Sequence, residues 1–281
     1  MVYISKAGPD NGFFSIEEGK KLAPCDQAFS QTIEPLQGRY PSTPQIGIGL
    51  NVLDCNTKRG DNIRVAASTD KKTASSFEVR VETWSVATLN SVLATWVEAR
   101  DGAKDTQMGQ WGTDRSSSYK GQSTQIKFPT AFKEPPEIVL WFRYLDLKPN
   151  GGQYRLHTYA SDVTSEGFTC HIETWNVSEF YRVGVTWVAS RKGRRGVETG
   201  RFVDSKEAIG RMAQKDRRIE FPKGKFTKPP TVLSGLSMLD NSAEQQLKLA
   251  SVVSDVSASG FTWNMETDSR WQTSADFIAI G

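Results

Sequence analysis

Three matching places along the chain each carry a cation, and an aromatic ring follows two of them. Arg64 lies in the segment NIRVAA, Arg155 in YRLHTY and Lys248 in LKLASV. Trp84 follows Arg64, and Trp175 follows Arg155. A guanidinium donates several hydrogen bonds to hydroxyl groups, and a flat ring packs on the apolar C–H face of a sugar. These residue types together indicate carbohydrate recognition.

Further aromatic side chains stand near two of these places. Tyr181 lies six residues after Trp175, and Trp271 is the candidate for the same place in the third segment. A tryptophan at the end of a strand more often packs than binds a ligand. Packing between subunits and stacking on a ligand are therefore both open for Trp84 and Trp175.

Catalysis is the next class of function to weigh, and the sequence disfavours it. His157 and His171 are the only two histidines, and no histidine and cysteine cluster has metal-ligand spacing. A Walker loop, G-x-S-x-G and H-E-x-x-H are all absent. Aspartates recur at one place in each segment, and we interpret them as turn or strand-end caps rather than as a glycosidase pair: Asp54, Asp146 and Asp240. We expect no enzymatic activity, no metal site and no cofactor.

Two motifs recur three times in step and must position these residues. The first runs from a proline to a Leu-Asp pair: PQIGIGLNVLD (44–54), PEIVLWFRYLD (136–146) and PTVLSGLSMLD (230–240). The second begins with a phenylalanine: FEVRVETW at 77, FTCHIETW at 168 and FTWNMETD at 261. Its starts lie 91 residues apart (77 to 168) and 93 residues apart (168 to 261). Such a period indicates tandem structural repeats.

The repeated segments are strand-like. They are rich in β-branched and aromatic residues and are bounded by turn clusters such as KPNGG, TSEG and SASG. Units of about 90 residues with about six short strands are typical of antiparallel β-sandwiches. We predict an all-β chain of three tandem antiparallel six-stranded β-sandwich modules at 1–102, 103–195 and 196–281, with RKGRRG (191–196) as the second linker. Only SIEEGKK (15–21) and SKEAIGRMAQ (205–214) are candidates for short helical turns.

Alternation along the second motif sorts its side chains into two faces. The inward faces are predicted to hold Phe77, Val79, Val81 and Thr83 in module 1, Phe168, Cys170, Ile172 and Thr174 in module 2, and Phe261, Trp263 and Met265 in module 3. Trp84 and Trp175 then fall on the polar face.

In their order and spacing, these motifs resemble the H-type lectin domain. The resemblance includes the closing aromatic strands SVLATWVEA, RVGVTWVAS and ADFIAIG, and it covers each module almost end to end. The family includes snail agglutinins and the C-terminal domain of slime-mould discoidins. Its members are six-stranded sandwiches that form trimers and bind N-acetylgalactosamine or galactose in clefts between protomers. The resemblance implies a lectin for such glycans, with its three modules packed about a pseudo-threefold axis and binding that needs no metal.

The binding residues of the family correspond unevenly to this chain. Its arginine corresponds to Arg64 and Arg155, with Lys248 in module 3, and its tryptophan to Trp84 and Trp175, with Asp268 in module 3. Its histidine is replaced by Ser85, Asn176 and Ser269, and its tyrosine is Tyr181 in module 2, Asn90 in module 1 and, as a candidate, Trp271 in module 3. Asp26 is the candidate for the neighbour's carboxylate. The best-kept predicted site is in module 2: Arg155, Trp175, Asn176 and Tyr181.

The composition limits the classes of partner and the cellular compartment that we expect for this protein. The 35 basic and 32 acidic residues give a net charge of +3, which argues against a nucleic-acid surface. Three scattered cysteines (Cys25, Cys55 and Cys170) favour a reducing compartment, and no apolar stretch reaches transmembrane length. The first residues show no apolar signal region, so we expect a cytoplasmic protein that binds glycans and neither nucleic acid nor membrane. Two questions stay open: assembly beyond the single chain, and the alternative of a structural or protein-interaction array that has lost sugar binding.

Overall fold

The computed structural model describes most of the chain. The described residues are 2–8, 11–16, 27–34, 38–55, 62–85, 87–113, 121–149, 152–176, 178–204, 217–244, 246–267 and 272–281. This part of the chain is all-β, as predicted, and it contains no helix long and apolar enough to cross a membrane. The segment 205–214 lies outside the described residues, as does 17–21, while Ser15 and Ile16 end a strand.

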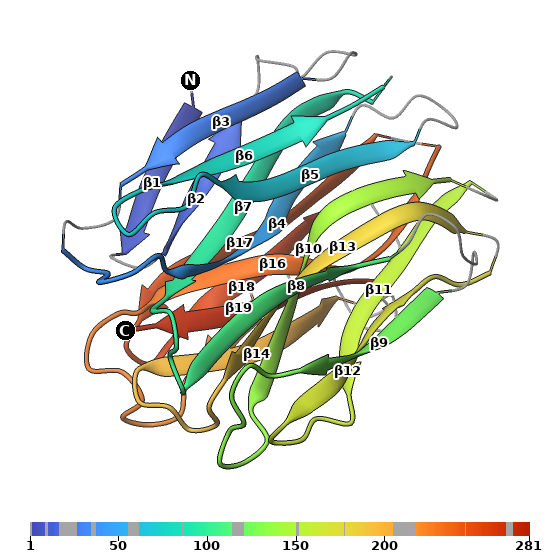
Figure 1. Cartoon of the computed structure of the whole chain (residues 1–281). Helices are drawn as coiled ribbons and strands as arrows, with labels where there is room; N and C mark the ends of the chain where they lie inside the picture. Colours follow the sequence, from blue (N-terminus) through green and yellow to red (C-terminus); the bar gives the residue numbers. More distant parts are fainter. Residues whose placement is uncertain are drawn as a thin grey trace.

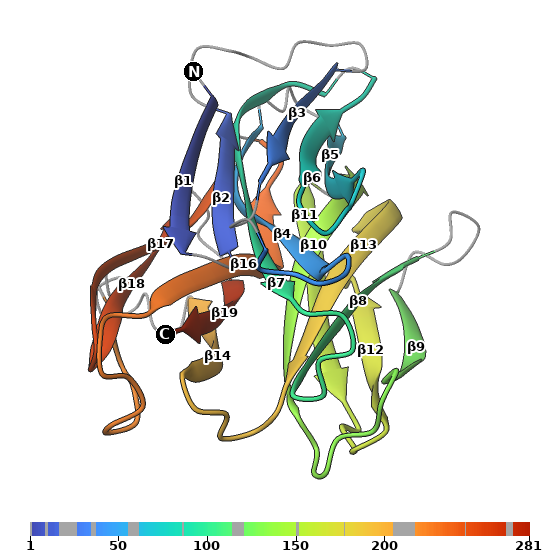
Figure 2. The same ribbon diagram turned by 60° about the vertical axis from the view of Figure 1, so that its left-hand side comes forward.

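The strands form three antiparallel sheets (Figures 1 and 2). Sheet A contains, in spatial order, β1 (Val2–Gly8), β2 (Asn11–Ile16), β7 (Leu89–Ala99), β4 (Gln45–Cys55), β17 (Leu247–Ser257), β18 (Gly260–Thr267) and β15 (Arg217–Glu220). Sheet B contains β3 (Gln27–Ile33), β6 (Phe77–Thr83), β5 (Ile63–Asp70), β10 (Glu137–Lys148), β13 (Glu179–Ser190) and β8 (Thr106–Gly112). Sheet C contains β14 (Val197–Asp204), β19 (Thr273–Ile280), β16 (Thr231–Ser242), β11 (Gln153–Ser161), β12 (Gly167–Glu173) and β9 (Gly121–Lys127).

Each module divides its strands between two sheets, and each sheet is shared by two modules. We keep the names module 1, 2 and 3 for residues 1–102, 103–195 and 196–281, although these boundaries stay predictions. Modules 2 and 3 place three described strands in each of their two sheets, which gives the six predicted strands. Module 1 has a seventh described strand, β1, at the edge of sheet A.

The three junctions between modules are equivalent strand pairs. β5 of module 1 pairs with β10 of module 2, β11 of module 2 with β16 of module 3, and β17 of module 3 with β4 of module 1. Each pair joins the strand that carries the predicted cation to the strand that ends its repeat in Leu-Asp. The modules therefore close into a ring through shared sheets, which is the connectivity of the predicted pseudo-threefold arrangement.

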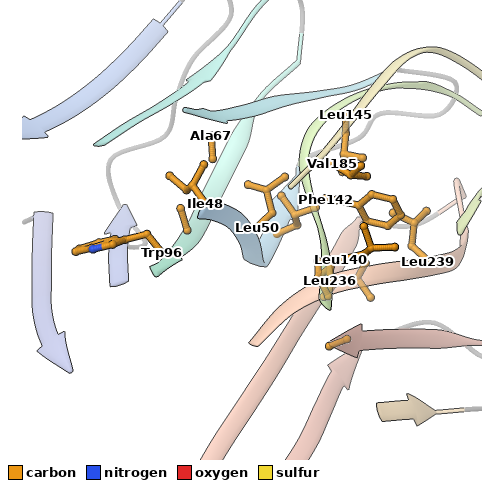
Figure 3. Close-up of a cluster of buried hydrophobic side chains, with 14 of the residues drawn as sticks. Ile48, Leu50, Ala67, Trp96, Leu140, Phe142, Leu145, Val185, Leu236 and Leu239 are labelled. Atoms are coloured by element: carbon orange, nitrogen blue, oxygen red, sulfur yellow. The ribbon is translucent and has the colours of Figure 1, made fainter. Parts of the chain in front are cut away.

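Alternation along the strands builds the interior as the sequence predicts. In β6 the odd-numbered residues are buried and in β12 the even-numbered ones, the residues between them are partly exposed, and β18 buries Phe261, Trp263 and Met265. One apolar cluster runs through all three modules. Figure 3 shows part of it as a continuous row of side chains from β4, β10 and β16, among them Leu50, Phe142 and Leu236. The core thus crosses the module boundaries.

A second apolar cluster lies where the three modules meet, and Trp141 is its largest member. The same place in the first motif is Gly49 in module 1 and Gly235 in module 3. A Cβ added to Gly49 would lie 2.5 Å from Trp141 Cβ, and one added to Gly235 would lie 2.5 Å from Trp141 Cγ. There is room for one large ring at this central position, and the two glycines leave that room.

Buried hydrogen bonds also join the modules in pairs. Thr186 Oγ1 donates to the Ile48 carbonyl (2.6 Å), and Asn51 Nδ2 donates to the Ser234 carbonyl (2.7 Å). The buried carboxylate of Asp276 pairs with Arg201 (2.6 Å) and accepts a hydrogen bond from the Leu140 backbone N–H (3.0 Å). These hydrogen bonds satisfy some of the polar groups that the interfaces bury, which favours one specific packing.

Candidate functional site

The three repeated aspartates lie inside strands, so our interpretation of them as turn or strand-end caps is wrong. Each stands opposite the cation of the preceding module in the ring: Asp146 opposite Arg64, Asp240 opposite Arg155 and Asp54 opposite Lys248. Two of the three form ion pairs, with 3.3 Å between Arg64 Nε and Asp146 Oδ1 and 3.3 Å between Arg155 Nε and Asp240 Oδ1. The three predicted cations therefore lie at the junctions, and each junction adds a carboxylate whose place in the site sequence analysis missed.

A threonine ties each predicted tryptophan to the strand of its cation. Thr83 Oγ1 donates to the Arg64 carbonyl (2.6 Å), and Thr174 Oγ1 donates to the Arg155 carbonyl (2.7 Å). Trp84 and Trp175 come directly after these threonines, so both are held at the cation's end of the sheet. Residues in the left-handed region follow at the place of the family's histidine: Ser85 (φ 61°) and Asn176 (φ 57°), both exposed.

The junction between modules 2 and 3 combines its ion pair with the ring of Trp175, on the same side of the sheet's junction. Trp175 is half-buried and has no aromatic partner within the described residues. Burial raises the pKa of the Asp240 carboxyl above its usual range, and the Arg155 guanidinium partly offsets this shift. His157 lies two residues after Arg155 in β11. Burial and the nearby Arg201 lower the pKa of His157 to about 4, so this imidazole is neutral at pH 7. The junction thus offers a guanidinium, a carboxylate, an amide and a half-buried indole that stacks on no ring of the described residues.

At the junction between modules 1 and 2, by contrast, the tryptophan is covered. The ring of Trp84 lies 5.0 Å from that of Tyr144 in module 2, at an interplanar angle of 31°. The guanidinium of Arg182 lies over the same tyrosine, 5.1 Å from its centroid. Of the two roles left open for Trp84, packing between modules is the one that the structure shows.

Tyr181 forms no hydrogen bond or ring contact with Arg155 or Trp175. It belongs to β13 in sheet B, whereas Arg155 lies in sheet C. Asp146 pairs with Arg182 and Leu147 with Phe180, so Tyr181 is the extra residue of a bulge beside Asp146. Its side chain is 43% exposed, and within the described residues it has no ring contact or hydrogen bond.

The junction between modules 3 and 1 differs most from the family pattern. Lys248 is exposed and forms no ion pair within the described part of the chain. Asp54 instead accepts a hydrogen bond from Asn90 Nδ2 (2.9 Å) and another from Gln246 of module 3. The predicted Trp271 lies outside the described residues, as do Asp268, Ser269 and Asp26. Across the described chain, no group of three or more His, Cys, Asp or Glu side chains could hold a metal ion.

Comparison with known proteins identifies the family. The model of the H-type lectin domain matches residues 36–97, 123–190 and 216–280, which is more than half of the chain and confirms three tandem copies. The chain belongs to the H-type lectin family and is, in general terms, a carbohydrate-binding lectin.

Solved structures with some similarity include two of discoidin II from Dictyostelium discoideum. The wild-type structure is 15% identical, and the match covers 67% of this chain and 79% of the discoidin II chain (TM-score 0.28). The native recombinant structure is 14% identical, and the match covers 68% of this chain and 81% of the discoidin II chain (TM-score 0.28). The comparison with curated proteins found no match.

Proposed function

We propose that the chain binds galactose- or N-acetylgalactosamine-type glycans at its module junctions, with its main site between modules 2 and 3. One observation carries the choice of junction: the Arg155–Asp240 pair, shared by two modules, stands at the end of the sheet that also holds Trp175, a half-buried ring with no aromatic partner within the described residues.

The chemistry of this junction suits a sugar. The free N–H groups of Arg155 donate to one hydroxyl, and the Asp240 carboxylate accepts from its neighbour. Trp175 supplies an apolar face for the C–H groups of the ring, and the exposed Asn176 takes the place of the family's histidine. Each hydrogen bond nets only about 1 kcal/mol against water, so a single site binds on the order of millimolar.

The other two junctions are weaker candidates. Trp84 already packs on Tyr144, and Asp54 is already bound by two amide side chains. Useful avidity then requires a second working junction or assembly beyond the single chain. The packing of Trp84 favours a second reading for that junction alone, in which it has become purely structural.

We further propose a non-catalytic cytoplasmic protein whose partners are glycoconjugates rather than nucleic acid or membrane. Cys55 and Cys170 are buried free thiols, and burial raises the pKa of Cys170 to about 12. A buried thiol of this kind is unreactive and suits a reducing compartment.

A glycan panel tests the proposed function. The wild-type chain should bind galactose-terminated glycans, Trp175→Ala should lose at least tenfold in affinity, and the matched Trp84→Ala should lose less than twofold. Thermal unfolding of all three proteins separates loss of binding from loss of folding. Failure of the wild type to bind any glycan would support the protein-interaction alternative, and equal losses in both variants would place the site elsewhere.

A further inference from the structure

A cavity of about 490 Å³ lies where the two connections between modules meet. Module 1 contributes the loop Gly38–Tyr40 and the end of β7 (Val97–Arg100), and the first connection contributes Asp105 and Thr106. Arg194 and Val197 come from the second connection and the start of β14, and Ile278 and Ile280 come from β19.

The cavity is remote from the junctions: along β16, Thr231 pairs with Ile280 of the cavity lining, whereas Asp240 lies nine residues further on (231 to 240), opposite Arg155. Along β7, Ser91 pairs with Asp54 and Ala99 pairs with Gln45. Eight residues of strand (91 to 99) therefore separate the level of Asp54 from the level of the cavity, which is roughly 25 Å. A ligand here would not compete with a sugar at the junctions.

The polar part of the lining has one more cation than carboxylates. Three arginines (Arg39, Arg100 and Arg194) face two carboxylates (Glu98 and Asp105). Arg194 pairs with Asp105 (3.1 Å) and donates to Thr106, and Glu98 Oε1 accepts from the indole N–H of Trp96 (3.2 Å). The Arg100 side chain is exposed and has no ion pair or hydrogen bond within the described residues. It is the cation left for an incoming anion.

The rest of the lining is apolar and continues the central cluster of the fold. Val97, Ala99, Val197 and Ile278 belong to that cluster, and Ile280 packs against it. The cavity therefore joins an exposed guanidinium to buried aliphatic side chains from two modules.

We propose that this cavity binds a small amphipathic anion, with a carboxylate, sulfate or phosphate head on a short apolar body. The head lies at Arg100 and Arg39, and the body lies on Val97, Val197 and Ile278. The volume is in the range of small-molecule sites, about 300–1,000 Å³. Since the lining comes from all three modules, the bound anion stabilises the closed ring against unfolding.

Titration calorimetry on the full chain tests this with three probes that share one tail: octyl sulfate, neutral tetraethylene glycol monooctyl ether and octyltrimethylammonium. Octyl sulfate should bind saturably at one site and raise Tm, and the other two should bind at least tenfold more weakly. Arg100→Gln should weaken octyl sulfate about tenfold, since a charge-assisted hydrogen bond contributes about 1.5 kcal/mol or more. Ala99→Trp should fill the cavity and abolish binding.

Arg195→Gln is the matched control, because Arg195 carries the same charge in the same connection as Arg194 and does not line the cavity. It should change the affinity for octyl sulfate less than twofold, and both arginine variants should keep the unliganded Tm. Absence of saturable binding, equal affinity for the neutral ether, or equal losses in Arg100→Gln and Arg195→Gln would each overturn the proposal.

Discussion

Arg155 and Asp240 belong to different modules, and the charge of each offsets part of the desolvation free energy of the other. Their side chains are only 13% and 11% exposed, so both charges have lost most of their water. A buried ion pair adds little net stability, because desolvation offsets the attraction between its charges. The pair therefore adds little to folding by itself, and we propose that at this junction it also serves glycan binding.

The raised pKa of Asp240 makes stability depend on pH with a definite sign. Because this pKa is higher in the folded chain than in the unfolded chain, the folded state holds the proton more tightly. The stability that Asp240 contributes is complete below its unfolded pKa of about 3.9 and is lost as pH rises through the folded pKa. Asp240→Asn, which mimics the protonated carboxyl, should thus become more stable relative to wild type between about pH 3 and pH 7. Urea unfolding of both proteins over this range checks it, and a variant that grows relatively less stable with rising pH would contradict it.

Single residues also show where sequence reasoning succeeds and where it stops. Residue type and spacing picked out Arg64, Arg155 and the two tryptophans; the structure places both arginines at module junctions and packs Trp84 across one of them. The role of the aspartates was missed because Arg155 and Asp240 are 85 residues apart (155 to 240), and no local pattern encodes their pairing. The available signal was that the cation and the Leu-Asp carboxylate recur the same number of times.

At the scale of elements, alternation was enough to predict the inside of each sandwich. A one-residue slip would have turned the buried face of β6 or β12 to water, so burial fixes the register strongly. The junction pairs follow a different rule. β5, β11 and β17 would each be an exposed edge in an isolated module, and unpaired edges invite association. Pairing with β10, β16 and β4 removes these edges, but which edge meets which depends on the whole molecule.

At the scale of the whole molecule, covalent joining has let the modules diverge together. A homotrimer would place three identical residues at the central position, and three tryptophans could not fit where a single ring already meets two glycines. The chain instead has Gly49, Trp141 and Gly235. Pattern analysis of one module could not have predicted this correlation.

This packing predicts that the effect of Gly235→Ala on the free energy of unfolding changes sign once Trp141 is replaced by alanine. Gly235→Ala should cost about 1–3 kcal/mol in the wild type because its Cβ meets the Trp141 ring. Trp141→Ala should cost about 3–5 kcal/mol through the cavity it leaves. In that background Gly235→Ala should be neutral or stabilising, because it fills part of the space. Urea unfolding of the four proteins measures the coupling, and simple additivity would show that the two positions do not share one space.

Titration of a galactose-terminated glycan against two aspartate variants shows whether two modules share one glycan site. Asp240→Asn changes module 3, whereas Arg155 and Trp175 lie in module 2, and thermal unfolding of both variants separates loss of binding from loss of folding. We predict that Asp240→Asn weakens binding at least tenfold and that Asp54→Asn, at the junction between modules 3 and 1, changes it less than twofold. Full affinity in Asp240→Asn, or equal losses in both variants, would contradict the account.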